Sequence, residues 1–474
     1  MIFPSTQTLF AKKVNMRPTE VVNQIYHPEF GIVFTNGDTW RSQRKTYVRL
    51  LKKSGFQKSH LKSVIDYIWP KMMEAMIKTP SIIMGLSEQP TVYSEQSANK
   101  NCALEKIELA LMELLTLTFA DKALFPGGNV PQEYLESFNT YHTCGVQWID
   151  ANALWYRYPI LRHLAPGLSG FLWIKDVIAE TDKNLNSIVS LHKRKDESYE
   201  EYSRTSTQVP PSMAKSDASY IDLYLEEIHR TVGDDAKCNL HKALIASLKN
   251  CLAGGDGIIM GLFALLYCLA RNPQVQEEMR IEIRAETETL PYCRAVILET
   301  LRYIPVGGIG PQHYSDQDLL VDGYKIPAGT DVYPNIMGIS QSEEHWDQPE
   351  VFNPRRFFGP DEKVGVHPKA WIPFSIGDRV CPAKSFSLDM LLMLGLKIVP
   401  ALELSFEGFV DEAVEGELKY YGMSLVHVHP FKMGVKELAP NDLESAIWTQ
   451  KSTRKKSLGM SALSADDVPG HLTE

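Results

Sequence analysis

Cysteine is scarce in this sequence, and the cysteines present do not form pairs. The 474 residues include 7 cysteines, an odd number, scattered without any Cys-x-x-Cys spacing. A disulfide framework needs paired cysteines, and a zinc site needs closely spaced ligands. The pattern therefore argues against both and favours a reducing compartment.

Positive charge is in deficit as well. The chain has 49 Lys and Arg residues against 58 Asp and Glu residues, a formal net charge of −9. Proteins that bind nucleic acid present an excess of positive charge to the phosphate backbone. We therefore expect no nucleic acid among the main partners.

Long apolar runs are also missing. The longest nearly uninterrupted one, Gly257–Ala270, has 14 residues. It is too short to span a bilayer, which needs about 20 residues, and is typical of a core helix. The first residues, Met1–Gln7, are too polar for a signal peptide or a membrane anchor. Any membrane contact is therefore expected to be peripheral.

Helical periodicity dominates what the sequence does contain. The apolar spacing predicts helices over 40–80, with a break near Gly55, and over 101–120, 131–195 and 218–232. One long helix is predicted from about His241 to Arg271, where Asn272-Pro273 ends it. The hydrophilic stretch 196–217 is predicted to be a loop.

Short apolar segments separated by turn residues predict a few strands, at 319–321, 324–326, 331–333 and 424–428. We therefore predict a fold that is mainly α with a small β-rich lobe (α+β). One domain is expected over 1–438, followed by a polar tail over 439–474 that is predicted to be disordered.

Cys381 has the most informative surroundings in the chain. The segment reads Trp371-Ile-Pro-Phe-Ser-Ile-Gly-Asp-Arg-Val-Cys381-Pro-Ala383, and an apolar helical pattern follows. Gly377 allows a tight turn, Arg379 supplies a charge suited to a carboxylate, and a helix start favours a thiolate. A lone cysteine is most often an inert buried residue, but this string predicts a loop that presents an anionic sulfur.

The pattern Phe374-x-x-Gly377-x-Arg379-x-Cys381 resembles the haem-ligand loop of the cytochrome P450 superfamily. The family has glycine where this chain has Ala383, a mild departure at a helix start. The resemblance covers about residues 25–437, most strongly 218–400. It implies a cytochrome P450-like fold and a haem b cofactor held through the Cys381 thiolate, the metal ligand.

The same resemblance implies further cofactor contacts. Trp40 and Arg44 are similar to the family's Trp-x-x-x-Arg helix, whose side chains hold a haem propionate, and both groups are pure donors. His313 precedes a strand-turn as a propionate-binding histidine does in many members, although a lone histidine is usually structural. Arg379 would be the remaining propionate partner.

Glu299 and Arg302, three residues apart, share one face of a predicted helix. A surface ion pair is the common interpretation of such spacing, but the flanking residues are apolar. With Arg356 the pair resembles the family's Glu-x-x-Arg motif and its downstream arginine. We interpret the three as a structural lock behind the haem. The family usually has glutamate at Arg355.

The segment Ala253-Gly254-Gly255-Asp256-Gly257 is similar to the family's distal helix motif except at its last position. There the family has threonine, whose hydroxyl holds a water, and here Gly257 has none. The resemblance implies that Asp256 manages protons. The glycine leaves open altered oxygen activation, peroxide rearrangement, or a water that replaces the hydroxyl.

The chain is identified as most like the animal microsomal members, with an N-terminus shorter than theirs: 39 residues precede Trp40, so the usual anchor and first strands are expected to be lacking. The implied function is a monooxygenase that inserts one atom of O2 into a small apolar lipid, steroid or xenobiotic, using electrons from NADPH through a cytochrome P450 reductase.

Two alternatives stay open, a haem isomerase or dehydratase acting on lipid peroxides and a non-catalytic haem-binding relative. A monomer is expected. The implied location is the endoplasmic reticulum membrane, with peripheral contact only, or otherwise the cytoplasm.

Overall fold

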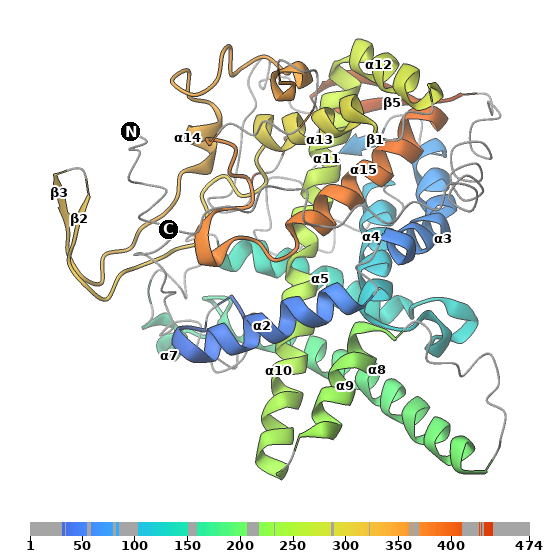
Figure 1. Cartoon of the computed structure of the whole chain (residues 1–474), viewed down its shortest axis with the longest axis vertical. Coiled ribbons are helices and arrows are strands. Elements are labelled where there is room, and N and C mark those ends of the chain that lie inside the picture. Colours follow the sequence, from blue (N-terminus) through green and yellow to red (C-terminus); the bar gives the residue numbers. More distant parts are fainter. Residues whose placement is uncertain are drawn as a thin grey trace.

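The molecule is built mainly of helices around one apolar core (Figure 1). The buried apolar side chains form a continuous cluster that extends from Ile32 to Met433. The computed structural model describes residues 31–33, 35–54, 58–78, 82–84, 103–149, 158, 160–205, 218–231, 233–285, 289–321, 323–359, 364, 369–409, 426, 428 and 431–438.

The principal helices, in chain order, are α2 Gly37–Lys53, α3 Lys58–Ile77, α4 Ala103–Phe119, α5 Gln132–Ile149, α7 Leu161–Leu164, α8 Phe171–Thr205, α9 Tyr220–Arg230, α10 Asp234–Ala253, α11 Gly255–Arg271, α12 Pro273–Arg284, α13 Pro291–Tyr303, α14 Ile336–Ser340 and α15 Lys384–Ala401. Short 3-10 turns include η4 Lys122–Leu124, η5 Pro126–Gly128, η8 Pro354–Phe357 and η9 Gly377–Arg379.

Helix α11 is the central element, because it packs against α4, α13, α15 and strand β4 Leu402–Phe409. Its side chains from Ile258 to Ala270 are almost all buried, as expected for a helix that is apolar on every side. Gly255 permits the contact with α4, since a Cβ there would lie 2.5 Å from a Leu115 methyl carbon. Helix α11 is therefore packed on all sides by neighbouring elements.

The β structure forms two small antiparallel sheets. Strand β5 Phe431–Glu437 lies between β1 Ile82–Met84 and β4, with a bulge between Phe406 and Gly408. Strands β2 Leu319–Val321 and β3 Tyr324–Ile326 form a hairpin that projects from the body (Figure 1). This hairpin and the predominance of helix confirm the predicted fold class.

Two predicted boundaries were wrong. The long helix is divided at Gly254 into α10 and α11, since two adjacent glycines weaken helix continuity. Residues 196–205, predicted to be a loop, continue α8 to Thr205. Their three glutamates and one arginine are good helix formers, a preference that outweighs their hydrophilic character.

The strand predictions agree only in part with the structure. Strands β1, β4 and β5 were not predicted, although β4 alternates buried and exposed positions over its first residues. Of the predicted strand at 331–333, Val332 makes an isolated bridge to His313. Most of 424–428 and all of 439–474 lie outside the described residues.

One helical stretch within the described ranges, Ala236–Arg271, is long and apolar enough to cross a membrane by length and composition. Its most apolar stretch of 18 residues is 82% buried inside the protein. That burial is what a core helix shows, in agreement with the interpretation of Gly257–Ala270.

The fold places α2 directly beside the segment that precedes α15 (Figure 1). The amino-terminal half of α2 and the loop that ends at Cys381 come together there, although more than 300 residues separate them: Arg44 donates to the Val380 carbonyl across 336 residues. At this junction Trp40 and Arg44 meet Arg379 and the loop of Cys381.

Candidate cofactor site around Cys381

The loop before α15 is closed by its own backbone. The Cys381 N–H donates to the Phe374 carbonyl at 2.9 Å, and the Val380 N–H donates to the Gly377 carbonyl at 3.0 Å. Ser375 and Gly377 have φ of 60° and 73°, the left-handed region that glycine enters most easily. The conformation thus requires the glycine that the sequence pattern singled out.

The surroundings of Cys381 act on the pKa of its thiol in opposite directions. Burial raises the pKa of the Cys381 thiol, whereas a hydrogen bond from the Ala383 N–H and the charges of Arg44 and Lys384 lower it. Lys384, at the first turn of α15, also lies over the Trp371 ring, 5.2 Å from its centroid. Burial is the largest of these influences and the pKa of the thiol is raised on balance, so the backbone donor and the two cations offset part of the cost of a thiolate.

Trp40 and Arg44 lie on the face of α2 that is turned toward the loop. Trp40 is 6% exposed, and its indole N–H is buried with no hydrogen-bond acceptor among the described residues. Arg44 lies near the same ring, 5.6 Å from its centroid, and donates to the Val380 carbonyl at 2.5 Å. A buried donor without an acceptor is costly, so the indole suits a ligand that accepts a hydrogen bond.

Arg379 also lies over the Trp40 ring, with its guanidinium carbon 4.1 Å from the ring centroid. It donates to the carbonyls of Ile32 and Thr35 at 3.3 and 2.8 Å and to the Asn36 side chain at 2.9 Å. Burial and the charge of Arg44 lower the pKa of Arg379 to about 10. Its surroundings therefore disfavour the positive charge, which an anionic ligand would stabilise.

These residues fit the carboxylates of a haem. The Trp40 indole is an unsatisfied buried donor, and two partly buried guanidinium groups lie beside it. Both kinds of group only donate hydrogen bonds, and guanidinium binds carboxylate with particular strength. Cys381 is on the same side of α2, within the electrostatic reach of Arg44.

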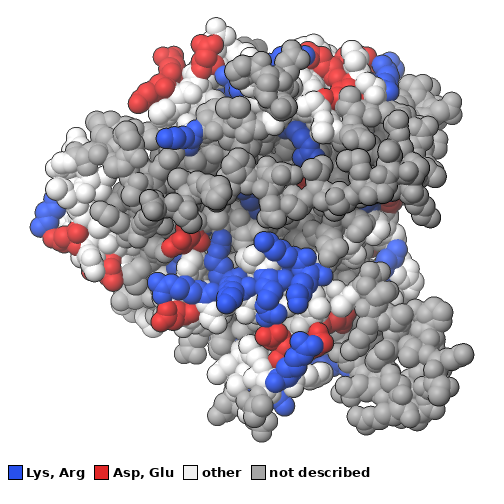
Figure 2. Space-filling view, in the orientation of Figure 1, with Lys and Arg blue, Asp and Glu red and all other residues white. Residues whose placement is uncertain are grey.

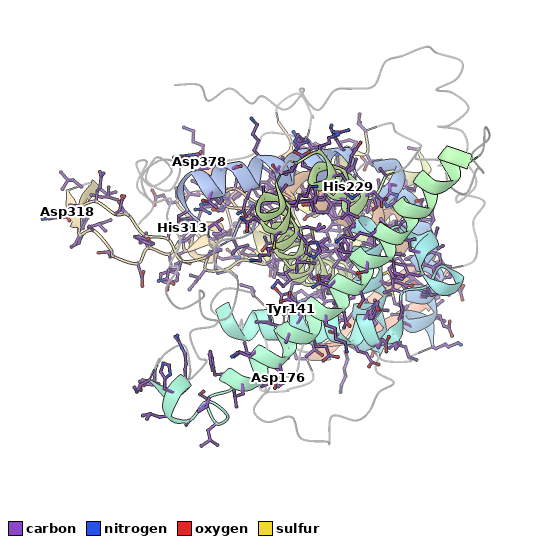
Figure 3. The ribbon with its side chains drawn as sticks, turned by 90° about the horizontal axis from the view of Figure 1, so that it is seen from below. Tyr141, Asp176, His229, His313, Asp318 and Asp378 are labelled. Carbon is purple, nitrogen blue, oxygen red and sulfur yellow. The ribbon has the colours of Figure 1, made fainter. Side chains whose placement is uncertain are left out.

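His313 lies on a separate segment. Its backbone pairs with that of Val332 through two hydrogen bonds, at 2.9 and 2.8 Å, and the residue is 1% exposed. Figure 3 shows His313 and Asp378 toward the side from which the β2–β3 hairpin projects. The hydrogen bonds described above connect Arg379, Asn36 and the loop without including the His313 ring, so its role stays a prediction.

The predicted distal residues are at the junction of α10 and α11. Asp256 and Gly257 belong to the first turn of α11, but the Asp256 side chain lies outside the described residues. A Cβ at Gly257 would meet no described atom within 4 Å. The space beside Gly257 is therefore not filled by any described residue.

Glu299, Arg302 and Arg356 lie together in the interior. Arg302 makes a two-pronged contact with Glu299, at 2.8 Å for both pairs of atoms, and Arg356 reaches the same carboxylate at 3.1 Å. Both arginines also donate to backbone carbonyls between Ser340 and Val351. The carboxylate accepts a further bond from the Asn353 N–H. The group ties α13 to the segment around η8.

Sequence reasoning did not find Lys384, Thr35 or Asn36. Lys384 is recognisable only as a charged residue in the first turn of a helix, which gives no indication of the sulfur. Asn36 directly precedes α2 and therefore has the signature of a helix cap. Arg355, the departure from the family motif, pairs with Glu278 of α12 at 2.6 Å.

Comparison with known proteins gives one clear family. The sequence profile described as cytochrome P450 matches residues 168–414. Among curated proteins, the chain is 27% identical to "Probable cytochrome P450 508A1" of Dictyostelium discoideum over 54% of this chain and 51% of that protein. It is 25% identical to rabbit (Oryctolagus cuniculus) "Cytochrome P450 2J1" over 80% of this chain and 70% of that protein.

A third relative, "Flavonoid 3'-monooxygenase" of Arabidopsis thaliana, is 27% identical over 46% of this chain and 51% of that protein. The chain thus spans about half the length of the Dictyostelium and Arabidopsis proteins that it matches.

We predict that Glu299→Gln lowers the free energy of unfolding by about 3–5 kcal/mol, because two buried guanidinium groups lose their counter-charge. Urea unfolding followed by circular dichroism measures the change. Glu278→Gln is the matched control, since its partner Arg355 is 64% exposed and such a pair contributes about 0–1 kcal/mol. Equal losses for the two variants would contradict a structural role for the buried group.

Proposed function

The chain belongs to the cytochrome P450 family, whose members bind haem through a cysteine thiolate, and on this premise we propose that it is a haem-thiolate monooxygenase. Haem with a thiolate ligand supplies activation of O2 for transfer of one oxygen atom to an organic substrate. The proposal is carried by one observation: the unsatisfied indole N–H of Trp40 and two guanidinium groups lie beside Cys381.

We assign each residue a role in holding the cofactor. Cys381 is the proposed iron ligand, and the Ala383 N–H with the charges of Arg44 and Lys384 favours its thiolate. Trp40, Arg44 and Arg379 are proposed to bind propionate, with His313 as a further candidate. Asp256 would hold a proton at the distal side, next to the open space at Gly257.

The proposed substrate is a small apolar organic molecule. Two relatives are named "Flavonoid 3'-monooxygenase" and "Ent-kaurene oxidase-like 5", names that denote oxidation of carbon compounds that differ widely. That breadth supports the reaction class and leaves the particular lipid, steroid or xenobiotic open.

We predict that purified protein gives the long-wavelength ferrous–CO band typical of a thiolate ligand, and that Cys381→Ser abolishes this band. The hydroxyl of serine does not supply the anionic sulfur that shifts it. Difference absorption spectroscopy measures the band. Cys238→Ser, at an exposed cysteine, should leave it intact. Bound haem without the band in the native protein would refute Cys381 as the ligand.

The outer face of α2 is proposed to dock the electron donor. Figure 2 shows a band of Lys and Arg side chains across the helix, in a chain whose net charge is −9. Arg41, Lys45, Arg49 and Lys52 recur at helical spacing on this face. Arg41 and Arg49 have ion-pair partners at Asp38 and Glu227, whereas Lys45 and Lys52 are exposed. The face fits an acidic partner such as an NADPH-dependent reductase.

We predict that Lys45→Glu/Lys52→Glu raises the KM for a cytochrome P450 reductase about tenfold at low ionic strength, because opposite charges steer the encounter. NADPH-driven turnover measures the effect. Lys183→Glu/Lys432→Glu, with the same charge change elsewhere, is the control. Peroxide-driven turnover should not change. Activity with peroxide alone, and none with NADPH and reductase, would instead favour the isomerase that Gly257 suggests.

A peripheral membrane contact is proposed at the region around α7. Its exposed apolar side chains include Leu164 and Leu168, which are 74% and 90% exposed. Leu320 and Tyr324 of the β2–β3 hairpin are exposed as well. Figures 1 and 3 show α7 and the hairpin toward the same side of the molecule. Apolar side chains gathered on one side suit the interfacial region of a bilayer.

We predict that Leu164→Asp/Leu168→Asp lowers partitioning onto phosphatidylcholine vesicles by at least about tenfold, because two leucine side chains no longer leave water. Vesicle co-sedimentation of the full chain measures the bound fraction. Ile281→Asp, at an exposed isoleucine of α12, is the matched control. Unchanged partitioning in the double variant would exclude this contact.

A further inference from the structure

Asn36 occupies a position that ordinarily serves to cap a helix. It is the N-cap residue of α2 and has extended backbone angles, φ −129° and ψ 170°. Asparagine is among the preferred residues there, because its side-chain oxygen accepts a hydrogen bond from an early helical N–H. In α2, however, the Asn36 side chain makes no capping hydrogen bond.

Several other cap residues among the described helices make the expected bond. The Ser219 side chain accepts from the Asp222 N–H at the start of α9, in a complete capping box. Asn335 and Asn353 cap α14 and η8 in the same way. Asn272 at the start of α12 makes no capping bond either, and its amide donates to the Cys268 carbonyl. Asn36 likewise has its side chain engaged elsewhere, although its identity and backbone conformation suit a cap.

The Asn36 oxygen accepts instead from Arg379, at 2.9 Å and across 343 residues of sequence. The same terminal nitrogen donates to the Thr35 carbonyl at 2.8 Å, and the other terminal nitrogen donates to the Ile32 carbonyl at 3.3 Å. The guanidinium is thereby held over the Trp40 ring. Of these three acceptors, Ile32 and Thr35 contribute backbone carbonyls and Asn36 contributes its side chain.

We infer that Asn36 is a positioning residue for the cofactor carboxylate: it orients the Arg379 guanidinium beside the Trp40 indole. This inference rests on the proposed function, since the carboxylate is that of the haem. A neutral amide is suited to the role because it accepts one hydrogen bond and leaves the positive charge of Arg379 for the ligand. A carboxylate at position 36 would compete with the ligand for that charge.

A variant with a carboxylate at position 36, which would compete with the ligand for Arg379, distinguishes a positioning role of Asn36 from a merely structural one. Asn36→Asp places an anion beside Arg379 and at the N-terminus of α2, and both changes stabilise the haem-free chain. If Asn36 were only structural, haem retention would be unchanged or improved. If it positions Arg379 for a carboxylate, haem retention falls while the stability of the haem-free chain rises.

The test measures the rate of hemin release from the full-length holoprotein to an excess of a haem-scavenging protein. We expect about tenfold faster release for Asn36→Ala, the loss of one hydrogen bond to a charged group. Release from Asn36→Asp should be at least as fast, with a higher thermal unfolding midpoint for the haem-free chain.

Reconstitution with hemin dimethyl ester, which lacks free carboxylates, tests the route of the effect. The difference between the native protein and Asn36→Ala should disappear with the ester. Ser219→Ala removes a true cap, so it should lower the unfolding midpoint without changing hemin release.

Equal release rates for the native protein and both Asn36 variants would overturn the inference, and so would an effect of the same size with the ester. Failure of the native protein to bind hemin would instead refute the proposed function.

Discussion

The buried positive charge of Arg379 is the constraint on which this site depends. Its guanidinium joins the loop of Cys381 to the backbone of residues 32–36, and so to the start of α2, while it stacks on Trp40. Burial and the nearby Arg44 disfavour that charge. The fold therefore holds a cation where its own interactions leave it incompletely stabilised, which is the electrostatic condition for binding an anionic group.

The opposite condition holds at Glu299. There a buried carboxylate receives bonds from Arg302, Arg356 and the Asn353 N–H, so its charge is stabilised within the protein. Two clusters of buried charge in the same chain thus differ in kind. The Glu299 group is internally complete and links elements of the scaffold, whereas the arginines beside Cys381 suit an external partner.

Helix α2 connects the interior with the surface. Its inner face buries Trp40, Tyr47, Leu50 and Leu51, and its outer face carries basic side chains (Figure 2). Arg44 reaches the Val380 carbonyl, one residue before the proposed ligand. In the proposed function, the surface that receives electrons and two of the residues that hold the cofactor, Trp40 and Arg44, therefore belong to one helix.

Much of this could be predicted from sequence because short segments encode local geometry. The glycine of the Cys381 loop, the shared face of Glu299 and Arg302, and the apolar character of α11 all follow from spacing within a few residues. The tertiary structure alone decided which distant groups meet. Asn36 has the local signature of a cap, and only a loop 343 residues away diverts its side chain. The Val380 carbonyl became a partner of Arg44 for the same reason, since a hydrogen bond acts through space and not along the chain.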